Sequence, residues 1–240
     1  MAIQDRRPCE FVSLGVLEYT RALALQEEVL SAKLQDRGTA DRIFFVEHPP
    51  VYTLGRRGGR ENLVVSESFL TEKGIRIVQT DRGGNITYHG PGQAVLYPVI
   101  DLESNRISVP DFVSGMEEIM KRTCIAFNVP ADRDPRNHGL WVGDKKIGSV
   151  GISIKKGISI HGLALNVNPD LVPFSWINPC GLANQAMTSI ALEREMPGQV
   201  LGREPQQKDR DLLKQVAELF ITSFCDIFGM EIESMEGTKI

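Results

Sequence analysis

Hydrophobic residues recur at helical spacing in three segments of the chain. In Glu18–Gln35 the apolar stripe runs from Tyr19 to Leu34, and Gly38 follows as a stop signal. Similar stripes predict two further helices, over Pro110–Phe127 and Asp209–Phe228. The segments between these helices carry shorter apolar runs of a different period.

These shorter runs predict strands. Four lie between the first two helices, at Ile43–Glu47, Val51–Leu54, Ile75–Gln79 and Ala94–Leu102. Three more, joined by short turns, predict a β-meander of Leu140–Val142, Lys146–Ile154 and Ile158–Val167. The strands cluster without regular βαβ alternation, which predicts an α+β fold with a mixed, mainly antiparallel sheet flanked by helices.

The chain is expected to form one domain over residues 1–240. Its length is sufficient for one full-sized core. Residues 193–208 are rich in glycine and proline, and we interpret them as a surface loop before the last helix. The alternative is a linker to the last helix.

Charge and cysteine content narrow the function classes. With 27 Lys and Arg against 31 Asp and Glu, the net charge of −4 gives no global attraction to nucleic acid or anionic membranes. The four cysteines form no CxxC pair, which indicates neither a metal site nor a disulfide framework. The charge-poor stretches are too rich in Gly, Pro, Asn and His to span lipid, and the N-terminus has no apolar signal core. We therefore expect a cytoplasmic protein.

The stretch Asp81–Gln93 is the strongest candidate for a binding loop. Its glycines let the backbone approach a ligand and expose N–H groups. It does not match a nucleotide-binding template, and neither does the GRRGGR run at 55–60. A tight loop around a structural histidine is the alternative.

Among the cysteines, Cys180 is the candidate nucleophile. It lies in a non-helical Asn-Pro-Cys-Gly turn, whereas Cys124 and Cys225 fall on amphipathic helices, where a small buried residue is the usual interpretation. A nucleophilic thiol must be converted to the thiolate, which requires a nearby cation, a base or a helix N-terminus.

Lys146 is the candidate cation. Period-two alternation places it on the same strand face as Val150, Ile152 and Ile154, provided that no bulge intervenes. An ammonium group on an apolar face has a lowered pKa, which suits a base as well as an electrostatic partner. The alternative is a lysine whose charged end reaches solvent at the strand end.

The four histidines divide by their surroundings. His89, among glycines, is the best functional candidate. His48 and His161 are interpreted as structural, and His138 as solvated.

Five ordered motifs between Glu47 and Ile190 resemble one known family. They are EHPPVYT at 47–53, RGGNITYHGPGQ at 82–93, KKIGSVG at 145–151, HGLALNV at 161–167 and NPCG at 178–181. The chain resembles the lipoyl(octanoyl) transferases, or lipoate-protein ligase B, within the biotin and lipoate protein ligases. The resemblance implies the fold of that group, a mainly antiparallel sheet with helices packed on it.

The resemblance also implies residue roles. Cys180 would form an acyl-thioester intermediate, and Lys146 would lower the pKa of its thiol. The acyl-binding site would be lined by Arg82, Gly83, Gly84, Asn85, Ile86, Thr87, Tyr88, His89, Ser149, Val150, Gly151, Gly162, Leu163 and Ala164. The backbone N–H groups of Gly83 and Gly84, or the His89 side chain, are candidate oxyanion donors.

The implied reaction moves an octanoyl group from acyl carrier protein to a lysine of a lipoyl domain. The acceptors would be the lipoyl domains of 2-oxoacid dehydrogenases and the glycine cleavage H protein. Going from a thioester to an amide needs no ATP, so we expect no cofactor, and we expect a monomer. Arg56, Arg57, Arg60 and the Lys155-Lys156 turn are candidate docking points for acidic partners, with a solvated face as the alternative.

Two other functions compete with this one. An ATP-dependent lipoate ligase would activate the free acid as an adenylate and would not need a catalytic cysteine. A non-catalytic module that binds acyl carrier protein would need neither Cys180 nor Lys146.

Overall fold

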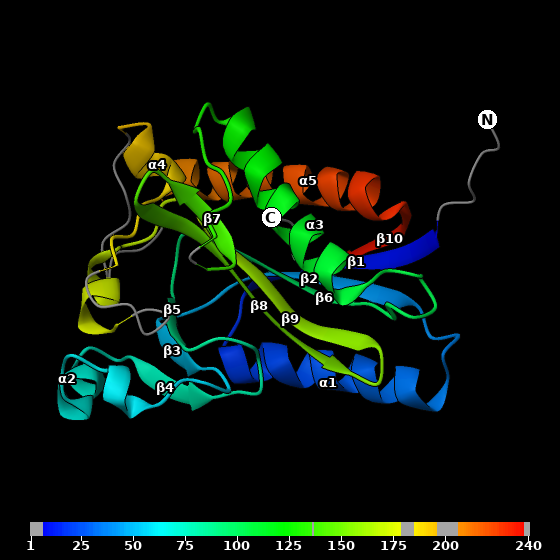
Figure 1. The fold of residues 1–240 in the computed structure, drawn as a ribbon, viewed down its shortest axis with the longest axis horizontal. Coiled ribbons are helices and arrows are strands. Elements are labelled where there is room, and N and C mark those ends of the chain that lie inside the picture. Colours follow the sequence, from blue (N-terminus) through cyan, green and yellow to red (C-terminus); the bar gives the residue numbers. More distant parts are fainter. Residues whose placement is uncertain (1–6, 136, 179–184, 196–205, 238–240) are drawn as a thin grey trace.

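A computed structural model of the chain describes residues 7–135, 137–178, 185–195 and 206–237. Its main element is a seven-stranded sheet in the order β10-β1-β2-β6-β9-β8-β7 (Figure 1). These strands are β1 (Arg7–Val16), β2 (Asp41–Glu47), β6 (Gln93–Val99), β7 (Gly139–Val142), β8 (Lys145–Lys155), β9 (Ile158–Asn166) and β10 (Met230–Gly237). Pairing is antiparallel from β2 to β7, and β1 is parallel to both of its neighbours. The predicted α+β class with a mainly antiparallel sheet is confirmed.

A second, three-stranded sheet has the order β4-β3-β5. Its strands are β3 (Val51–Leu54), β4 (Arg76–Gln79) and β5 (Ile86–His89). The helices are α1 (Tyr19–Gln35), α2 (Glu67–Glu72), α3 (Val109–Ala126), α4 (Ile190–Glu193) and α5 (Gln207–Phe228), with 3-10 turns at Arg60–Asn62 and Val172–Trp176. The small sheet has its own apolar cluster, which contains Tyr52, Tyr88 and Phe174.

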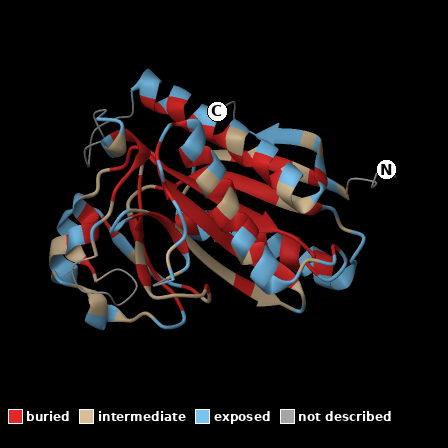
Figure 2. Ribbon diagram, turned by 45° about the horizontal axis from the view of Figure 1, so that its top comes forward, coloured by how far each residue is buried: buried red, intermediate tan, exposed pale blue. Residues whose placement is uncertain are grey.

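Helices cover both faces of the large sheet. Figure 1 shows α3 and α5 on one face and α1 on the other. Strand residues divide accordingly, because Leu163 and Leu165 of β9 join the cluster under α3 and α5, whereas Ile160 and Ala164 join the cluster under α1. The central strands are therefore buried on both sides (Figure 2).

The sequence pattern identified the interior elements and missed those at the periphery. The three predicted helices are present as α1, α3 and α5, each within two residues of its expected bounds. The four predicted strands and the meander are present as well. Strands β1, β5 and β10 and the short helices α2 and α4 were not expected. The missed β10 is exposed along most of its length and carries three glutamates, so it shows no clear apolar alternation.

The segment before α5 was predicted to be a surface loop. Within the predicted surface loop at 193–208, residues 196–205 lie outside the described part of the chain. The single-domain organisation stays a prediction. In the described ranges, no helix combines the length and the apolar character needed to cross a lipid bilayer.

A buried ion pair links the end of α1 to the start of β2. Lys33 Nζ lies 2.6 Å from Asp41 Oδ1, and the two side chains are only 1% and 8% exposed. Lys33 also donates to the Thr39 carbonyl, and Asp41 accepts hydrogen bonds from the Asp101 N–H and the Asn105 side chain. Because both charged ends have several partners, loss of one partner leaves an uncompensated buried charge.

Asp41→Ala is therefore expected to lower the free energy of unfolding by about 3–5 kcal/mol, measured by urea denaturation. The matched control is Arg60→Ala, which breaks an ion pair with Glu67 whose side chains are 62% and 53% exposed. That substitution is expected to cost about 1 kcal/mol or less. Equal effects of the two substitutions would show that the buried pair has no special role.

Candidate functional site

A cavity of about 340 Å³ lies between the β8–β9 ribbon and the glycine-rich segment before β5. It is lined by Lys146 and by all of the predicted acyl-binding residues except Tyr88. Tyr88 points into the cluster of the small sheet, where its ring centroid lies 5.5 Å from that of Tyr52 and 5.4 Å from that of Phe174. The fold thus brings three of the five sequence motifs to one cavity, and the roles of their residues stay predictions.

Lys146 reaches this cavity through a β-bulge. In the β7–β8 pairing, Trp141 is opposite Lys146 but Leu140 is opposite Gly148, so Ile147 is an extra residue on β8. Ile152 and Ile154 pack toward α3 and α5, and Val150 does so while also bordering the cavity, whereas Lys146 lines the cavity from the other face. The expectation that Lys146 shares a face with these three residues is therefore wrong, because the bulge reverses the alternation.

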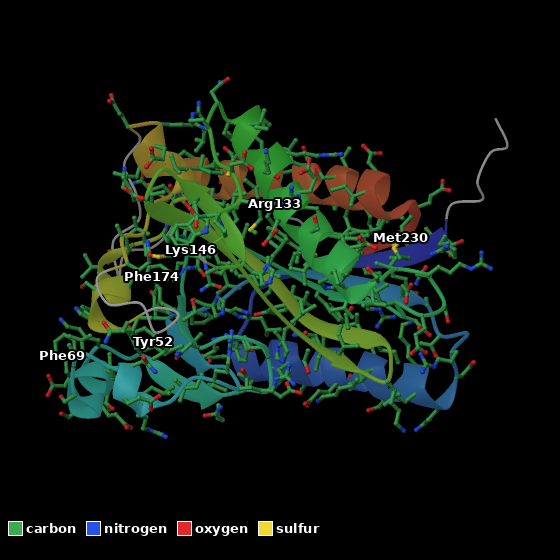
Figure 3. The ribbon with its side chains drawn as sticks, in the orientation of Figure 1. Tyr52, Phe69, Arg133, Lys146, Phe174 and Met230 are labelled. Atoms are coloured by element: carbon green, nitrogen blue, oxygen red, sulfur yellow. The ribbon has the colours of Figure 1, made fainter. Side chains whose placement is uncertain are left out.

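The Lys146 side chain is enclosed by β7. It is 2% exposed, and its Nζ donates to the His138 carbonyl at 2.9 Å and lies 5.3 Å from the Trp141 ring centroid. A Cβ at Gly139 would be only 2.8 Å from Lys146 Cε, so glycine is needed for this close approach. Figure 3 labels Lys146 beside the β7–β8 ribbon.

A carboxylate on α3 fixes the segment that Lys146 contacts. Glu117 Oε1 accepts the Gly139 N–H at 2.9 Å, and Arg133 Nε lies 3.2 Å from Glu117 Oε2. Glu117 thereby sets the position of the adjacent His138 carbonyl. Sequence reasoning missed Glu117 because a single glutamate on an amphipathic helix is normally solvated, and this one is buried.

Cys180 lies outside the described residues, but the chain beyond it returns to Lys146. The Lys146 N–H donates to the Ala186 carbonyl, and the Thr188 N–H donates to the Lys146 carbonyl, both at 2.9 Å. Met187 is paired with Lys146 in a parallel bridge. Residues 186–188, which follow Cys180 in the sequence, are therefore attached to the backbone of the candidate cation.

The glycine-rich loop is held between two sheets. Buried Arg82 donates to the carbonyl and the hydroxyl of Thr53 on β3. The Gly83 N–H donates to the Ile152 carbonyl at 2.8 Å. This N–H is already bonded, which argues against the expectation that it serves as an oxyanion donor. A Cβ at Gly151 would lie 3.2 Å from the Gly83 carbonyl oxygen, so the missing side chain at Gly151 leaves space between loop and strand.

Buried aromatic rings form the inner end of the cavity. Tyr19, His89, Tyr97 and His161 all line it, and the Tyr19 ring stacks on His89 with centroids 6.0 Å apart. Burial lowers the pKa of His89 well below its usual value, so this imidazole is neutral. Tyr19 and Tyr97 were missed because an aromatic residue on a predicted helix or strand is normally a core residue.

His161 connects Tyr19 with Asp81. Its Nδ1 lies 3.2 Å from the Tyr19 hydroxyl, and its Nε2 lies 2.8 Å from Asp81 Oδ1. Burial raises the pKa of Tyr19 to about 12 and lowers that of His161. The pKa of Asp81 is about 2, because its hydrogen bonds to His161 and Lys155 outweigh the opposing effect of burial. The neutral imidazole therefore accepts from Tyr19 and donates to the Asp81 carboxylate.

The remaining histidines match their expected surroundings. His48 is fully buried, with Nδ1 donating to the Leu17 carbonyl at 2.7 Å and Nε2 accepting from the Tyr97 hydroxyl at 2.9 Å. The His138 side chain is 74% exposed.

The candidate docking residues are not equivalent. Exposed Arg57 lines the mouth of the cavity together with Asn137 and His138. Arg60 pairs with Glu67, and Lys155 Nζ lies 2.8 Å from Asp81. Of these three cations, Arg57 is therefore the one at the cavity entrance.

A family model described as the lipoyl protein ligase A/B catalytic domain matches residues 18–201. The chain belongs to this family. An octanoyltransferase of Desulfotalea psychrophila is 44% identical over 211 residues, which are 87% of this chain and 92% of that protein. An octanoyltransferase named as mitochondrial, from Arabidopsis thaliana, is 40% identical over 194 residues, which are 80% and 82% of the two chains.

Solved structures agree with the family at the level of the fold. Lipoate-protein ligase A bound with ATP superposes with a TM-score of 0.70 at 15% identity, covering 96% of this chain and 90% of that one. A bi-partite lipoate protein ligase from Thermoplasma acidophilum gives a TM-score of 0.65 at 18% identity, covering 97% and 88%. The expected lipoate-ligase-like fold is confirmed.

The buried neutral histidines predict a pH dependence of stability. Burial lowers the pKa of His48 from 6.5 to about 4, and those of His89 and His161 are also lowered. The unfolded chain takes up these protons at higher pH than the folded chain, so stability decreases as the pH falls below about 6.5. Each histidine contributes a slope of about 1.4 kcal/mol per pH unit until its folded pKa is reached.

His48→Gln is expected to reduce this slope by about that amount between roughly pH 6 and pH 4.5, measured by urea unfolding at a series of pH values. His138→Gln, at an exposed side chain, is the control and should leave the slope unchanged. If His48→Gln leaves the slope of stability against pH at its wild-type value, His48 is not buried and neutral in the folded protein.

Proposed function

We propose that this chain is an octanoyltransferase of lipoate biosynthesis, which moves an octanoyl group from acyl carrier protein to a lysine of a lipoyl domain. The observation that carries the proposal is the 44% identity, over 87% of the chain, to a protein named octanoyltransferase. The cavity supports it, since the glycines and aliphatic residues among its lining suit an acyl chain. A buried lysine in its wall supplies a cation or a base.

In the proposed mechanism, the Cys180 thiolate attacks the carbonyl carbon of the donor thioester. The tetrahedral intermediate collapses to an acyl-Cys180 thioester, and the carrier leaves as a thiol with a proton from Lys146. The amine of the acceptor lysine, deprotonated by Lys146, then attacks this thioester. An amide forms, Cys180 is regenerated, and no ATP is consumed.

The surroundings of Lys146 support this role. Its ammonium group has the His138 carbonyl and the Trp141 ring as fixed partners, which orient it within the cavity. Its backbone is bonded to Ala186 and Thr188, on the segment that follows Cys180. A lysine that is oriented in this way suits proton transfer to and from a thiol placed next to it.

We further propose that acyl carrier protein and lipoyl domains dock at the cavity mouth, where Arg57 offers a positive charge to acidic partners. The acceptors would be the lipoyl domains of 2-oxoacid dehydrogenases and the glycine cleavage H protein. The enzyme would act as a cytoplasmic monomer, in a reducing environment that keeps Cys180 as a thiol.

An ATP-dependent lipoate ligase is the second candidate, because the chain shares its fold with lipoate-protein ligase A bound with ATP. The match is at 15% identity and concerns the fold alone, whereas relatives at 36–45% identity are named octanoyltransferase. A non-catalytic module is disfavoured by the presence of both Cys180 and Lys146.

Incubation with octanoyl-acyl carrier protein is expected to add one octanoyl group to the protein, detected by intact mass, and a lipoyl domain should then remove it. Cys180→Ala should abolish the adduct, whereas Cys124→Ala should retain it. An octanoyl adduct on the Cys180→Ala protein would refute the assignment of Cys180 as the nucleophile. Pyrophosphate release from ATP and lipoate, without transfer from the carrier protein, would favour the ligase.

Lys146→Met is expected to slow alkylation of Cys180 near neutral pH, by about tenfold for each unit by which the thiol pKa rises. Peptide mass mapping follows Cys180 separately, and burial raises the pKa of Cys9 and Cys124 to about 12, which keeps them unreactive. The control is Lys145→Met, at the preceding, exposed lysine that pairs with Glu193. An unchanged rate-versus-pH profile for Lys146→Met would contradict its role.

A further inference from the structure

We propose that the ring of Tyr19, oriented by His161 and Asp81, closes the inner end of the acyl cavity and sets the longest acyl chain that is transferred. This inference rests on the proposed function. Tyr19 and His161 line the cavity and are 2% and 1% exposed, whereas Arg57 and His138 at its mouth are exposed. The cavity therefore has an open end and a closed end.

The strand register orders the cavity from Lys146 to Tyr19. Along the β8–β9 ribbon, Ser149 pairs with Ala164, Gly151 with Gly162, and Ile152 with His161. The Tyr19 hydroxyl is bonded to the last of these residues. The three steps from Ser149 to Ile152 span about 10 Å, which is close to the length of an extended eight-carbon chain.

His161 faces the cavity because its backbone departs from the strand conformation. By alternation with Leu163 and Leu165, its side chain would point toward α3 and α5. Its φ of +60° instead turns the imidazole toward Tyr19 on α1. A left-handed conformation is unfavourable for histidine, so the surrounding contacts must hold it. These contacts are the bond to Asp81 and the bond from the His161 N–H to the Gln26 side chain.

The Tyr19 ring is fixed on several sides. Besides its bond to His161, it packs on His89, His48 and Tyr97, with centroid distances of 6.0, 5.3 and 6.4 Å. Asp81 in turn is bonded to His161 and Lys155, on the two strands of the ribbon. A longer acyl chain would have to displace this packed group of rings, and close-packed interiors resist such displacement.

The polar atoms of the wall are directed into their own hydrogen bonds. His161 uses both ring nitrogens, and the Tyr97 hydroxyl is bonded to His48. The terminal methyl group of the acyl chain would therefore meet ring carbon atoms. On this basis Tyr19 is the specificity-determining residue, and His161 and Asp81 are positioning residues that act through it.

The test compares octanoyl with dodecanoyl acyl carrier protein as competing donors. Tyr19→Ala is expected to raise the dodecanoyl-to-octanoyl ratio of kcat/KM by at least about tenfold, since each buried methylene changes affinity about fourfold. Tyr19→Leu, which is less disruptive to the core, should raise the same ratio by a smaller factor. Tyr19→Phe retains the ring but loses the hydroxyl that is bonded to His161, so its ratio should lie between those of wild type and Tyr19→Leu.

The matched control is Tyr52→Ala, which removes a buried tyrosine of the small sheet that does not line the cavity. It is expected to lower stability without changing the ratio. His161→Asn should raise the ratio in the direction of Tyr19→Ala, which a merely structural role would not do. A ratio that Tyr19→Ala and Tyr19→Leu both leave at the wild-type value would overturn the inference.

Binding of free fatty acids keeps this test independent of the reaction. For the wild-type protein, calorimetry should show affinity rising with chain length up to eight carbons and no further, and Tyr19→Leu should extend the rise to longer acids. Identical profiles for the two proteins would refute the claim that Tyr19 closes the inner end of the cavity. Failure of the wild-type protein to transfer octanoyl would instead refute the proposed function and leave the binding profile to decide on Tyr19.

Discussion

Along β8 and β9, successive side chains alternate between the layer of α3 and α5 and the layer of α1. Strict alternation would direct both Lys146 and His161 into the apolar core under α3 and α5, where a charged or polar group lacks partners. A one-residue bulge at Ile147 turns Lys146 to the cavity face, and a left-handed backbone at His161 does the same on β9. The polar content of the cavity depends on these two local irregularities in an otherwise regular sheet.

The two irregularities have different energetic costs, and different interactions compensate for them. The bulge leaves one residue unpaired and is compensated by burial of Ile147 in the core. The left-handed histidine is strained, and the strain is compensated by hydrogen bonds to three residues, two on α1 and one in the loop after β4. Between them, Gly151 and Gly162 are paired across the ribbon, and both border the cavity.

Much of this arrangement was predictable from the sequence, because apolar periodicity and turn residues act locally. The helices and central strands followed from periodicity, and the motifs around Arg82, Lys146 and Gly162 lie together as the family resemblance implied. The face of Lys146 was not predictable, since a bulge depends on the pairing with Trp141 on another strand. Tyr19 and Glu117 were missed for a related reason, because only tertiary contacts distinguish them from ordinary core and surface residues.

The edge of the large sheet joins segments that are far apart in the chain. Strand β1 begins at Arg7 and pairs in parallel with β10, which begins at Met230. During synthesis, β1 leaves the ribosome early, whereas its outer partner is made only after α5. Until then, the outer edge of β1 has no strand to pair with, and unpaired edges promote association between chains. The cavity residues are therefore translated before the sheet that supports them is complete. In the interval until β10 is made, the nascent chain can associate with other chains through the open edge of β1.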